Sequence, residues 1–421
     1  MLSMQYIRDN AADVRAMLAR RHVEAPLDEI LALDVEHRRL LRESEELKAE
    51  RNAASKRIGA TKDPEERGRL IAEQQGAREQ IDRLDEAAKG AGERLRSLLL
   101  QVPNVVLPEV PEGPDESGNV VTRQHGALPV FDFAPKPHWE LGEQLGIIDF
   151  EAGVKMSGSR FYVLEGLGAR LQWALIQYML DLHIHEHGLH PIYPPFMVKE
   201  ECFWATGDLP KFQDNIYRDA EDDLWMVTTA EVPLTNLWRE EIIPPGRLPL
   251  RYVAYTACFR REKMSAGRDV RGMKRGHQFD KVEMFTYCEP ERSADELAAM
   301  LERAEAVCRG LGLTYRIVQL CTGDLGFKAG VTYDIETWAP GQQEWLEVSS
   351  VSNVLDFQAR RANIRFRREA GGRTEFPHML NGSGLALPRV VISVLETYQQ
   401  ADGSVVVPEA LRGYLRTDVI R

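Results

Sequence analysis

Residues 251–288 read RYVAYTACFRREKMSAGRDVRGMKRGHQFDKVEMFTYC, and this stretch decides the expected fold. Two runs rich in aromatic and β-branched residues flank a basic loop, which predicts two strands joined by that loop. Further strands follow, only some of them separated by helical patterns, so we expect an α+β fold with helices flanking an antiparallel sheet. The expected strands are Arg251–Phe259, Lys281–Cys288, Tyr315–Leu320 and Glu344–Val351, and the expected helices are Gly168–His187 and Ser293–Gly310.

The same stretch carries side chains suited to holding a nucleotide. The first strand ends in Arg260-Arg261-Glu262, and the returning strand presents Phe279 and Glu283. An arginine fork matches two phosphate oxygens, and a phenylalanine ring offers a flat face to a base. The connecting loop adds a compact basic patch, made of Lys263, Arg268, Arg271, Lys274 and Arg275. A solvated hairpin without a ligand is the alternative interpretation.

A second segment, Glu347-Val348-Ser349-Ser350, lies on an expected strand. Strand alternation places Glu347 and Ser349 on one face and the other two residues on the opposite face, unless a bulge intervenes. A carboxylate beside phosphates is unfavourable without a cation between them, so Glu347 in such a site implies Mg²⁺. A purely structural strand is the alternative.

A third segment, NGSGLALPR at residues 381–389, runs into the apolar helix expected at Val390–Tyr398. Its glycines let the backbone approach a ligand closely. Arg389 comes at the start of the helix, where a positive group and the helix N-terminus both favour an anion. A simple glycine-rich turn is the alternative.

Towards the N-terminus, two runs show seam residues spaced by three and four, which predicts two long helices that share a narrow apolar seam. Gly59 ends the first helix, Asp63 caps the second, and Pro64 suits its first turn, so we expect an antiparallel hairpin. The seam positions are Ile30, Leu33, His37, Leu40, Ser44, Leu47, Arg51, Ala54 and Ile58, then Leu70, Gln74, Ala77, Ile81, Leu84, Ala88, Ala91, Leu95 and Leu98. A dimerising coiled coil is the alternative, although the polar seam positions would make a weak zipper.

The expected organisation is an N-terminal helical arm at residues 1–102, a proline-rich connector at 103–130 and an α+β domain at 131–421 that contains the three segments above. The net charge of −12 does not indicate a nucleic-acid binder, so a polyanion would have to meet local basic patches. Five cysteines without a CxxC pair fit a reducing cytoplasm. We expect no membrane segment or signal peptide, and the common phosphate-binding glycine motifs are absent.

Together the three catalytic segments resemble the signature motifs of class II aminoacyl-tRNA synthetases, in the order of that class. GLHPIYPPFM at 188–197 resembles the motif that forms its dimer interface. Several further runs resemble seryl-tRNA synthetases in particular. These runs are TTAEVPLTN at 228–236, AGRDVRG at 266–272, HQFDKVE at 277–283, CTGD at 321–324, DFQARR at 356–361 and LNGSGL at 380–385.

The resemblance implies a cytoplasmic homodimer that activates serine with ATP and loads tRNA(Ser), which it grips with the N-terminal arm. The implied serine pocket consists of Thr229, Ala230, Glu231, Glu283 and Ser383. The implied ATP-binding residues are Arg260, Arg261, Glu262, Phe279, Glu347, Val348, Ser349, Ser350 and Arg389. Among them Arg260, Glu347 and Arg389 would be catalytic, and Glu347 and Ser350 would bind Mg²⁺. We expect no zinc, because no group of cysteines in this sequence resembles the zinc site of the archaeal-type seryl-tRNA synthetases.

The sequence departs from the family pattern at Arg261, Lys263, Met264, Lys274, Gly276 and Met379. The loop residues among these could alter tRNA or ATP contacts, and Met379 could reshape the wall beside Ser383. His183 and His187 are one helical turn apart, but we expect surface or interface histidines there rather than a metal site.

Two other functions stay open at this point: a paralogue that passes an activated amino acid to a carrier protein or small molecule, and a non-catalytic coiled-coil protein. Whether a selenocysteine tRNA is also a substrate is open too.

Overall fold

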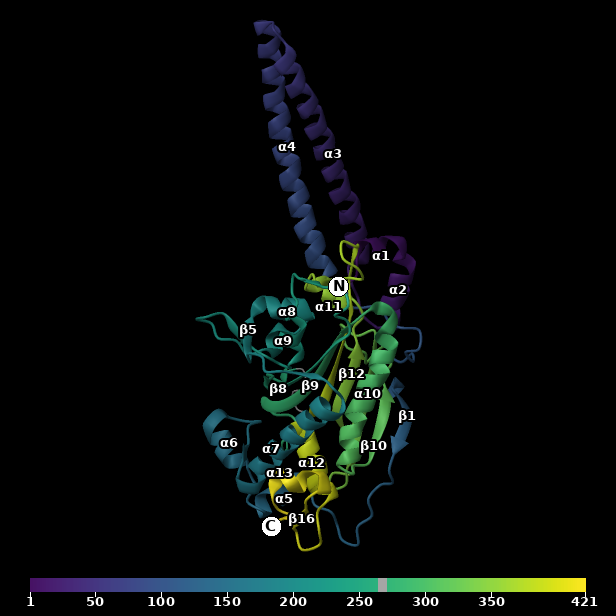
Figure 1. The fold of residues 1–421 in the computed structure, drawn as a ribbon, viewed down its shortest axis with the longest axis vertical. Helices are drawn as coiled ribbons and strands as arrows, with labels where there is room; N and C mark the ends of the chain where they lie inside the picture. The colour runs from purple at the N-terminus through teal and green to yellow at the C-terminus, as the bar shows by residue number, and fades with distance from the viewer. Residues whose placement is uncertain (264–270) are drawn as a thin grey trace. The chain divides into compact units, whose positions relative to one another are not determined.

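The computed structural model describes residues 1–263 and 271–421, with the side chains of residues 73–75 left out. Its backbone contacts divide the chain into two compact units. One unit comprises residues 2–19 and 23–103, and the other comprises Met1, residues 20–22 and residues 104–421. The first unit contains a helical hairpin, and the second is built around a large sheet (Figure 1).

The hairpin consists of α3 (Leu27–Ala60) and α4 (Pro64–Leu99), preceded by the short helices α1 (Met4–Asp9) and α2 (Ala11–Arg20). Every predicted seam side chain that the structure describes is buried or half-buried, so the heptad-like pattern is confirmed within a single chain. Asp63 caps α4 as predicted, because its side chain accepts a hydrogen bond from the Glu65 amide at 3.0 Å. The first helix continues one residue beyond Gly59 and ends at Ala60.

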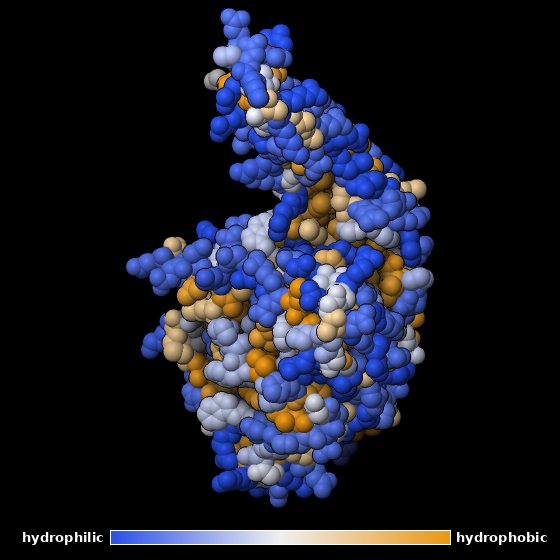
Figure 2. Space-filling model, turned by 45° about the horizontal axis from the view of Figure 1, so that its top comes forward, coloured by the Kyte–Doolittle hydropathy of each residue, from blue (hydrophilic) through white to orange (hydrophobic). Residues whose placement is uncertain are grey.

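Polar seam residues find partners across the hairpin. The Ser44 hydroxyl donates to Asp85 at 2.5 Å, and the Lys48 ammonium lies 2.8 Å from the same carboxylate. The polar seam position Ser44 therefore has a partner on the facing helix. The outer faces are charged, and the visible surface of the hairpin is mostly hydrophilic (Figure 2).

The second unit is organised by an eight-stranded sheet in which neighbouring strands are antiparallel, except that β4 runs parallel to β8. This architecture confirms the predicted antiparallel sheet with flanking helices. In spatial order the strands are β1 (Val120–His125), β10 (Tyr315–Gln319), β11 (Val331–Ala339), β12 (Glu344–Asn353), β15 (His378–Ala386), β9 (Gln278–Cys288), β8 (Leu250–Phe259) and β4 (His190–Ile192).

The two faces of this sheet have different environments, as strand β9 illustrates. Val282 and Met284 point into the main core, which includes residues of α7 (Gly166–Asp181), α10 (Ser293–Gly310) and α12 (Leu387–Thr397). Alternation sends Glu283 and Phe285 to the opposite face. There Phe285 joins a second apolar cluster, while Glu283 lines a cavity. The sheet therefore rests on helices on one face and carries a polar cavity on the other.

Short elements complete the second unit. The remaining helices are α5 (His138–Gln144), α6 (Phe150–Ser157), α8 (Glu200–Thr206), α9 (Glu231–Thr235), α11 (Phe357–Arg361) and α13 (Glu409–Leu415). Three minor sheets have two strands each: β2 (Ile148–Asp149) with β3 (Val163–Leu164), β5 (Met197–Lys199) with β6 (Leu224–Met226), and β16 (Val405–Val406) with β17 (Val419–Ile420). A further minor sheet has three strands, in which β13 (Arg365–Arg367) lies between β14 (Thr374–Glu375) and β7 (Ile242–Ile243). Within the described residues, no helix is long and apolar enough to cross a bilayer.

Candidate active site

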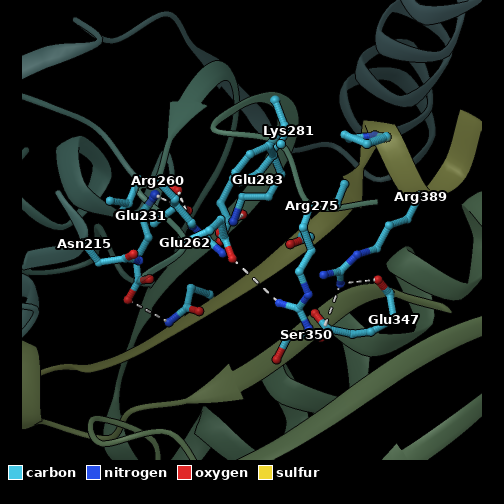
Figure 3. Close-up of a pocket in the computed structure, with 18 of the residues that line it drawn as sticks. Asn215, Glu231, Arg260, Glu262, Arg275, Lys281, Glu283, Glu347, Ser350 and Arg389 are labelled. Carbon is cyan, nitrogen blue, oxygen red and sulfur yellow. Dashed lines mark hydrogen bonds and ion pairs between the residues drawn. The ribbon is translucent and has the colours of Figure 1, made fainter. Parts of the chain in front are cut away.

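A cavity of about 600 Å³ opens on the polar face of the sheet and gathers side chains from all three predicted segments (Figure 3). Strands β9, β12 and β15, the first turn of α12 and the residues just after β8 contribute to its wall. The predicted site residues that line it are Thr229, Glu231, Arg260, Glu262, Phe279, Glu283, Glu347, Ser350, Ser383 and Arg389. The sequence segments that were expected to act together therefore do meet in space.

A β-bulge decides which residues of β12 reach the cavity. Along β11, Ile335 pairs with Ser349 and the next residue pairs with Glu347, so Val348 is an extra residue without a partner. Such a bulge reverses the alternation beyond it. As a result Glu347 and Ser350 both line the cavity. The bulge is the exception that the sequence analysis allowed for, and uninterrupted alternation, which would place Glu347 and Ser350 on opposite faces, does not hold here.

Val348 and Ser349, which lie between Glu347 and Ser350, do not line the cavity. Val348 is buried in the main core, and Ser349 is buried with its hydroxyl donating to the Ser383 carbonyl at 2.7 Å. Ala230 is also fully buried and belongs to the second apolar cluster. These three predicted residues support the wall from behind.

A second irregularity lies beside the predicted serine pocket, at Gly384 in β15. Ser383 pairs with Glu283 on β9 and Leu385 pairs with Val282, which leaves Gly384 unpaired between them. A Cβ atom at Gly384 would lie 2.6 Å from His183 Nε2, so only glycine fits without displacing that ring.

His183 therefore supports the site from the core. The expectation that it is a surface or interface histidine is wrong, because the ring is not exposed. The ring is fully buried in a π-helical turn, η2 (Leu182–Glu186), with Nε2 3.2 Å from the Gly384 carbonyl. Its Nδ1 lies 2.9 Å from His187 Nδ1. Burial lowers the pKa of His183 to about 3, so the ring is neutral and Nε2–H donates to the carbonyl.

Two arginines are fixed at the cavity by backbone oxygens. Arg260, just after β8, donates from Nε to the Thr228 carbonyl at 3.2 Å, and its guanidinium lies 5.1 Å from the centre of the Phe279 ring. Arg389 donates from Nη1 to the Glu347 carbonyl at 2.6 Å and lies 3.3 Å from the Glu347 carboxylate. Both guanidinium groups are thus held in place with donors left for an anion.

Arg261 is directed differently from its neighbour. It does not belong to the cavity lining, and its guanidinium lies over the Tyr217 ring at 4.3 Å. Its Nε donates to the Ile216 carbonyl at 3.1 Å. The role of Arg261 in ATP binding stays a prediction.

Each of two buried carboxylates in the cavity has a lysine partner. Lys281 Nζ lies 2.5 Å from Glu283 Oε2, and Lys328 Nζ lies 2.8 Å from Glu231 Oε1. Burial raises the pKa of Glu283, and the charge of Lys281 offsets part of this effect. The negative charge of each carboxylate is therefore partly balanced by a lysine in the wall.

Sequence reasoning missed several polar residues of the wall. Lys281 could have been predicted, because it is two residues from Glu283 on the same strand and must share its face. Lys328 comes from the loop before β11, and no pattern marks it. The missed lining residues with charged or amide side chains are Asp208, Asn215, Lys281, Lys328 and Asn381.

The departures from the family pattern fall in different places. Lys274 and Gly276 line the cavity, together with Arg275. Met379 is fully buried in the second apolar cluster and is not part of the cavity wall. Met264, another departure, and Arg268 of the predicted basic patch lie outside the described residues.

The chain matches models of two protein domains. Residues 1–106 match the seryl-tRNA synthetase N-terminal domain, and residues 211–398 match the tRNA synthetase class II core domain (G, H, P, S and T). It is 60% identical to the serine--tRNA ligase of Roseiflexus castenholzii, covering 100% of both chains. It is 57% identical to the serine--tRNA ligase of Thermomicrobium roseum, over 99% of this chain and 93% of the relative.

Two crystal structures are similar over the whole chain. Seryl-tRNA synthetase from Pyrococcus horikoshii, complexed with ATP, superposes with a TM-score of 0.96 at 37% identity, covering 100% of this chain and 99% of that one. Cytoplasmic serine-tRNA ligase from Naegleria fowleri, in complex with AMP, gives a TM-score of 0.89 at 28% identity with the same coverage.

Proposed function

Because the chain belongs to the seryl-tRNA synthetase family, we propose that it activates L-serine with ATP and transfers the seryl group to the 3′ end of tRNA(Ser). The observation that carries the proposal is the cavity, where Arg260 and Arg389 face the same space as the buried carboxylates of Glu231 and Glu283. Cationic groups suit the phosphates of ATP, and carboxylates suit the ammonium and hydroxyl groups of serine.

The reaction has two steps. A carboxylate oxygen of serine attacks the α-phosphorus of ATP, the bond to the β-phosphate oxygen breaks, and pyrophosphate leaves. A terminal hydroxyl of the tRNA then attacks the carbonyl of seryl-adenylate, and AMP leaves. Neither step needs a protein nucleophile, so catalysis depends on positioning and on neutralising phosphate charge. We assign Arg260 to the α-phosphate and Arg389 to the γ-phosphate.

The base of ATP has a candidate platform in Phe279. The Arg260 guanidinium already covers this ring at 5.1 Å, so we place a stacked adenine against its other face. Glu262, which also lines the cavity, is assigned to positioning the adenine.

The residues at the bulge of β12 fit Mg²⁺ bound together with phosphates. Glu347 supplies a carboxylate and Ser350 a hydroxyl, both of which are the hard oxygen ligands that this ion prefers. Behind them, burial and the neighbouring Glu347 charge raise the pKa of Asp334 well above its usual range. Asp334 Oδ1 has no hydrogen-bond partner in the described part of the chain. Mg²⁺ would relieve this crowding of negative charge and would neutralise phosphate oxygens during the reaction.

We assign the recognition of the serine hydroxyl to Glu283. Its Oε2 lies beside Lys281 but forms no hydrogen bond of good geometry with any described residue. A hydroxyl that donates to this carboxylate satisfies it, whereas alanine leaves it unsatisfied. A site built for a hydroxyl rejects a substrate without one for this reason.

We assign tRNA binding to the hairpin, supported by the match of residues 1–106 to the family's N-terminal domain. We also propose that the enzyme is a homodimer. The exposed apolar side chains of Met156 and Trp173 border a surface hollow, and Tyr193 lies exposed in the segment that resembles the dimer motif. Exposed apolar side chains that gather on one surface, as Met156 and Trp173 do at the hollow, mark association surfaces. The five cysteines are free thiols, which fits a cytoplasmic enzyme.

The proposed function is tested by serine-dependent exchange of pyrophosphate into ATP, followed by charging of tRNA(Ser). A variant that lacks residues 30–98 should retain exchange and lose charging. Arg94 lies 2.5 Å from Glu29, and α4 ends five residues later at Leu99, so a short glycine linker can join the ends of the deletion. Exchange without charging by the complete chain would favour a carrier-directed enzyme, and absence of exchange would exclude the proposed activity.

A further inference from the structure

Lys328 lines the cavity beside Glu231, one of the carboxylates assigned to the amino acid. Its ammonium lies 2.8 Å from Glu231 Oε1 and 3.2 Å from Asp208 Oδ1. Burial disfavours the charged form, but the two carboxylates outweigh it and raise the pKa of Lys328 above its ordinary value. Lys328 therefore stays charged and connects Asp208, which follows α8, to Glu231, which begins α9.

The two oxygens of Glu231 are used unequally. Oε1 interacts with three donors: Lys328 Nζ at 2.8 Å, Gln358 Nε2 at 2.6 Å and Asn381 Nδ2 at 3.3 Å. In contrast, Oε2 accepts no hydrogen bond from any residue within 1–263 or 271–421. Glu231 is 5% exposed and lines the cavity, so a ligand can supply the missing partner.

Without Lys328, two carboxylates would face the cavity, and Glu231 would lose the cationic partner that fixes its orientation. A carboxylate held in place in advance binds its partner better than a mobile one.

We propose that Lys328 is a positioning residue for recognition of the amino acid, holding Glu231 by one oxygen so that the other receives the α-ammonium group of the substrate. This inference rests on the proposed function, since it takes serine as the amino acid in the cavity. Under this proposal the enzyme prefers an amino acid over the same molecule without its amino group because Lys328 and Glu231 act together, and Glu231 alone is not sufficient.

The test uses the full-length enzyme with Lys328→Met, which removes the charge but keeps the length, and Lys328→Arg, which keeps the charge. Loss of a charge-assisted contact should raise the KM for serine about 10- to 100-fold in Lys328→Met. The KM for ATP should stay within about twofold, and Lys328→Arg should recover most of the loss. Lys211→Met is the matched control, because Lys211 lies over the Phe327 ring at 5.1 Å and does not line the cavity.

A second measurement separates positioning from a general loss of structure. The affinity of a non-hydrolysable seryl-adenylate analogue is compared with that of the same analogue without its amino group. The amino group should improve binding by the native enzyme and contribute little in Lys328→Met, while both proteins bind the deaminated analogue equally. If Lys328→Met does not fold, Lys328→Gln provides the same comparison.

Three results decide between the two proposals. Absence of serine-dependent exchange in the native enzyme contradicts the proposed function itself. A native enzyme that is active, with an unchanged serine KM in Lys328→Met, overturns the role of Lys328 alone. If Lys328→Met bound both analogues more weakly by the same factor, the positioning role would also be overturned, because the result would show a structural role for Lys328.

Discussion

The hairpin and the catalytic cavity follow different rules. In the hairpin, a spacing of three and four residues is kept over two long helices, and every described seam position is buried or half-buried. In the cavity, the arrangement depends on interruptions of regular structure, at Val348 in β12 and at Gly384 in β15. Periodicity therefore fixes where elements form, whereas the chemistry depends on where the pattern breaks. The predictions below test this contrast, beginning with the largest expected effect.

Arg260→Ala should cause the largest loss. The Arg260 guanidinium is held by the Thr228 carbonyl and the Phe279 ring, so it is already in place when phosphate charge develops. Removing one such group from a transition state typically lowers kcat by about 10²- to 10³-fold. Pyrophosphate exchange at saturating serine and ATP measures the effect.

Arg218→Ala is the matched control for Arg260→Ala. Arg218 also covers an aromatic ring, Trp225 at 5.4 Å, but it does not line the cavity. We expect this variant to keep nearly all activity. Equal losses in the two variants would show that arginine–aromatic packing matters here and that phosphate binding by Arg260 does not.

Glu283→Ala should reduce kcat/KM for serine about 100-fold and change the KM for ATP much less. It removes the proposed acceptor for the serine hydroxyl and leaves the Lys281 ammonium buried without its partner at 2.5 Å. Exchange assays with serine, alanine and threonine give the ratios. The preference for serine over alanine should shrink in the variant, and an unchanged kcat/KM for serine would contradict the assignment.

Most of the fold follows from short-range patterns. The predicted strands and helices match observed elements closely, and α10 occupies the predicted range of Ser293–Gly310. The hairpin turn also follows from local chemistry, because Asp63 and Pro64 have the intrinsic preferences of a helix start. Neither result depends on contacts between distant parts of the chain.

The cavity could be predicted only in part. The three segments that line it were found because each has a residue pattern of its own. Lys328 could not be found, because its role depends on two carboxylates that are distant in sequence and meet it only in the folded chain. The grouping of Glu347 with Ser350 depends on the bulge at Val348, and an alternating pattern contains no signal for an extra residue.

Gly384→Ala tests the second interruption and should have a moderate effect. The added Cβ would lie 2.6 Å from His183 Nε2, and the buried His183 ring is held by contacts on both nitrogens. Overpacking of this kind costs about 1–3 kcal/mol of unfolding free energy. The displacement should also move Ser383 and raise the KM for serine about tenfold, since an overpacking strain of this size acts directly beside the pocket.

Gly413→Ala is the control for this variant, because a Cβ at Gly413 meets no atom within 4 Å. Thermal unfolding and the serine KM are measured for both proteins. A Gly384→Ala enzyme with native stability and native serine KM would mean that the bulge tolerates a side chain and does not position Ser383.

Asp63→Ala should have the smallest effect, and one confined to the hairpin. Asp63 Oδ1 accepts the Glu65 amide hydrogen at 3.0 Å, so the substitution leaves a donor at the start of α4 without its side-chain partner. Loss of an N-cap costs about 1 kcal/mol, which corresponds to roughly fivefold faster exchange of amide hydrogens in the first turn. Asp63→Ser should keep the cap and the slow exchange. Because the cap is a local device, serine-dependent pyrophosphate exchange should be unchanged in both variants. A marked loss of that activity in Asp63→Ala alone would show that the hairpin is coupled to amino-acid activation, and the contrast between the two regions would then fail.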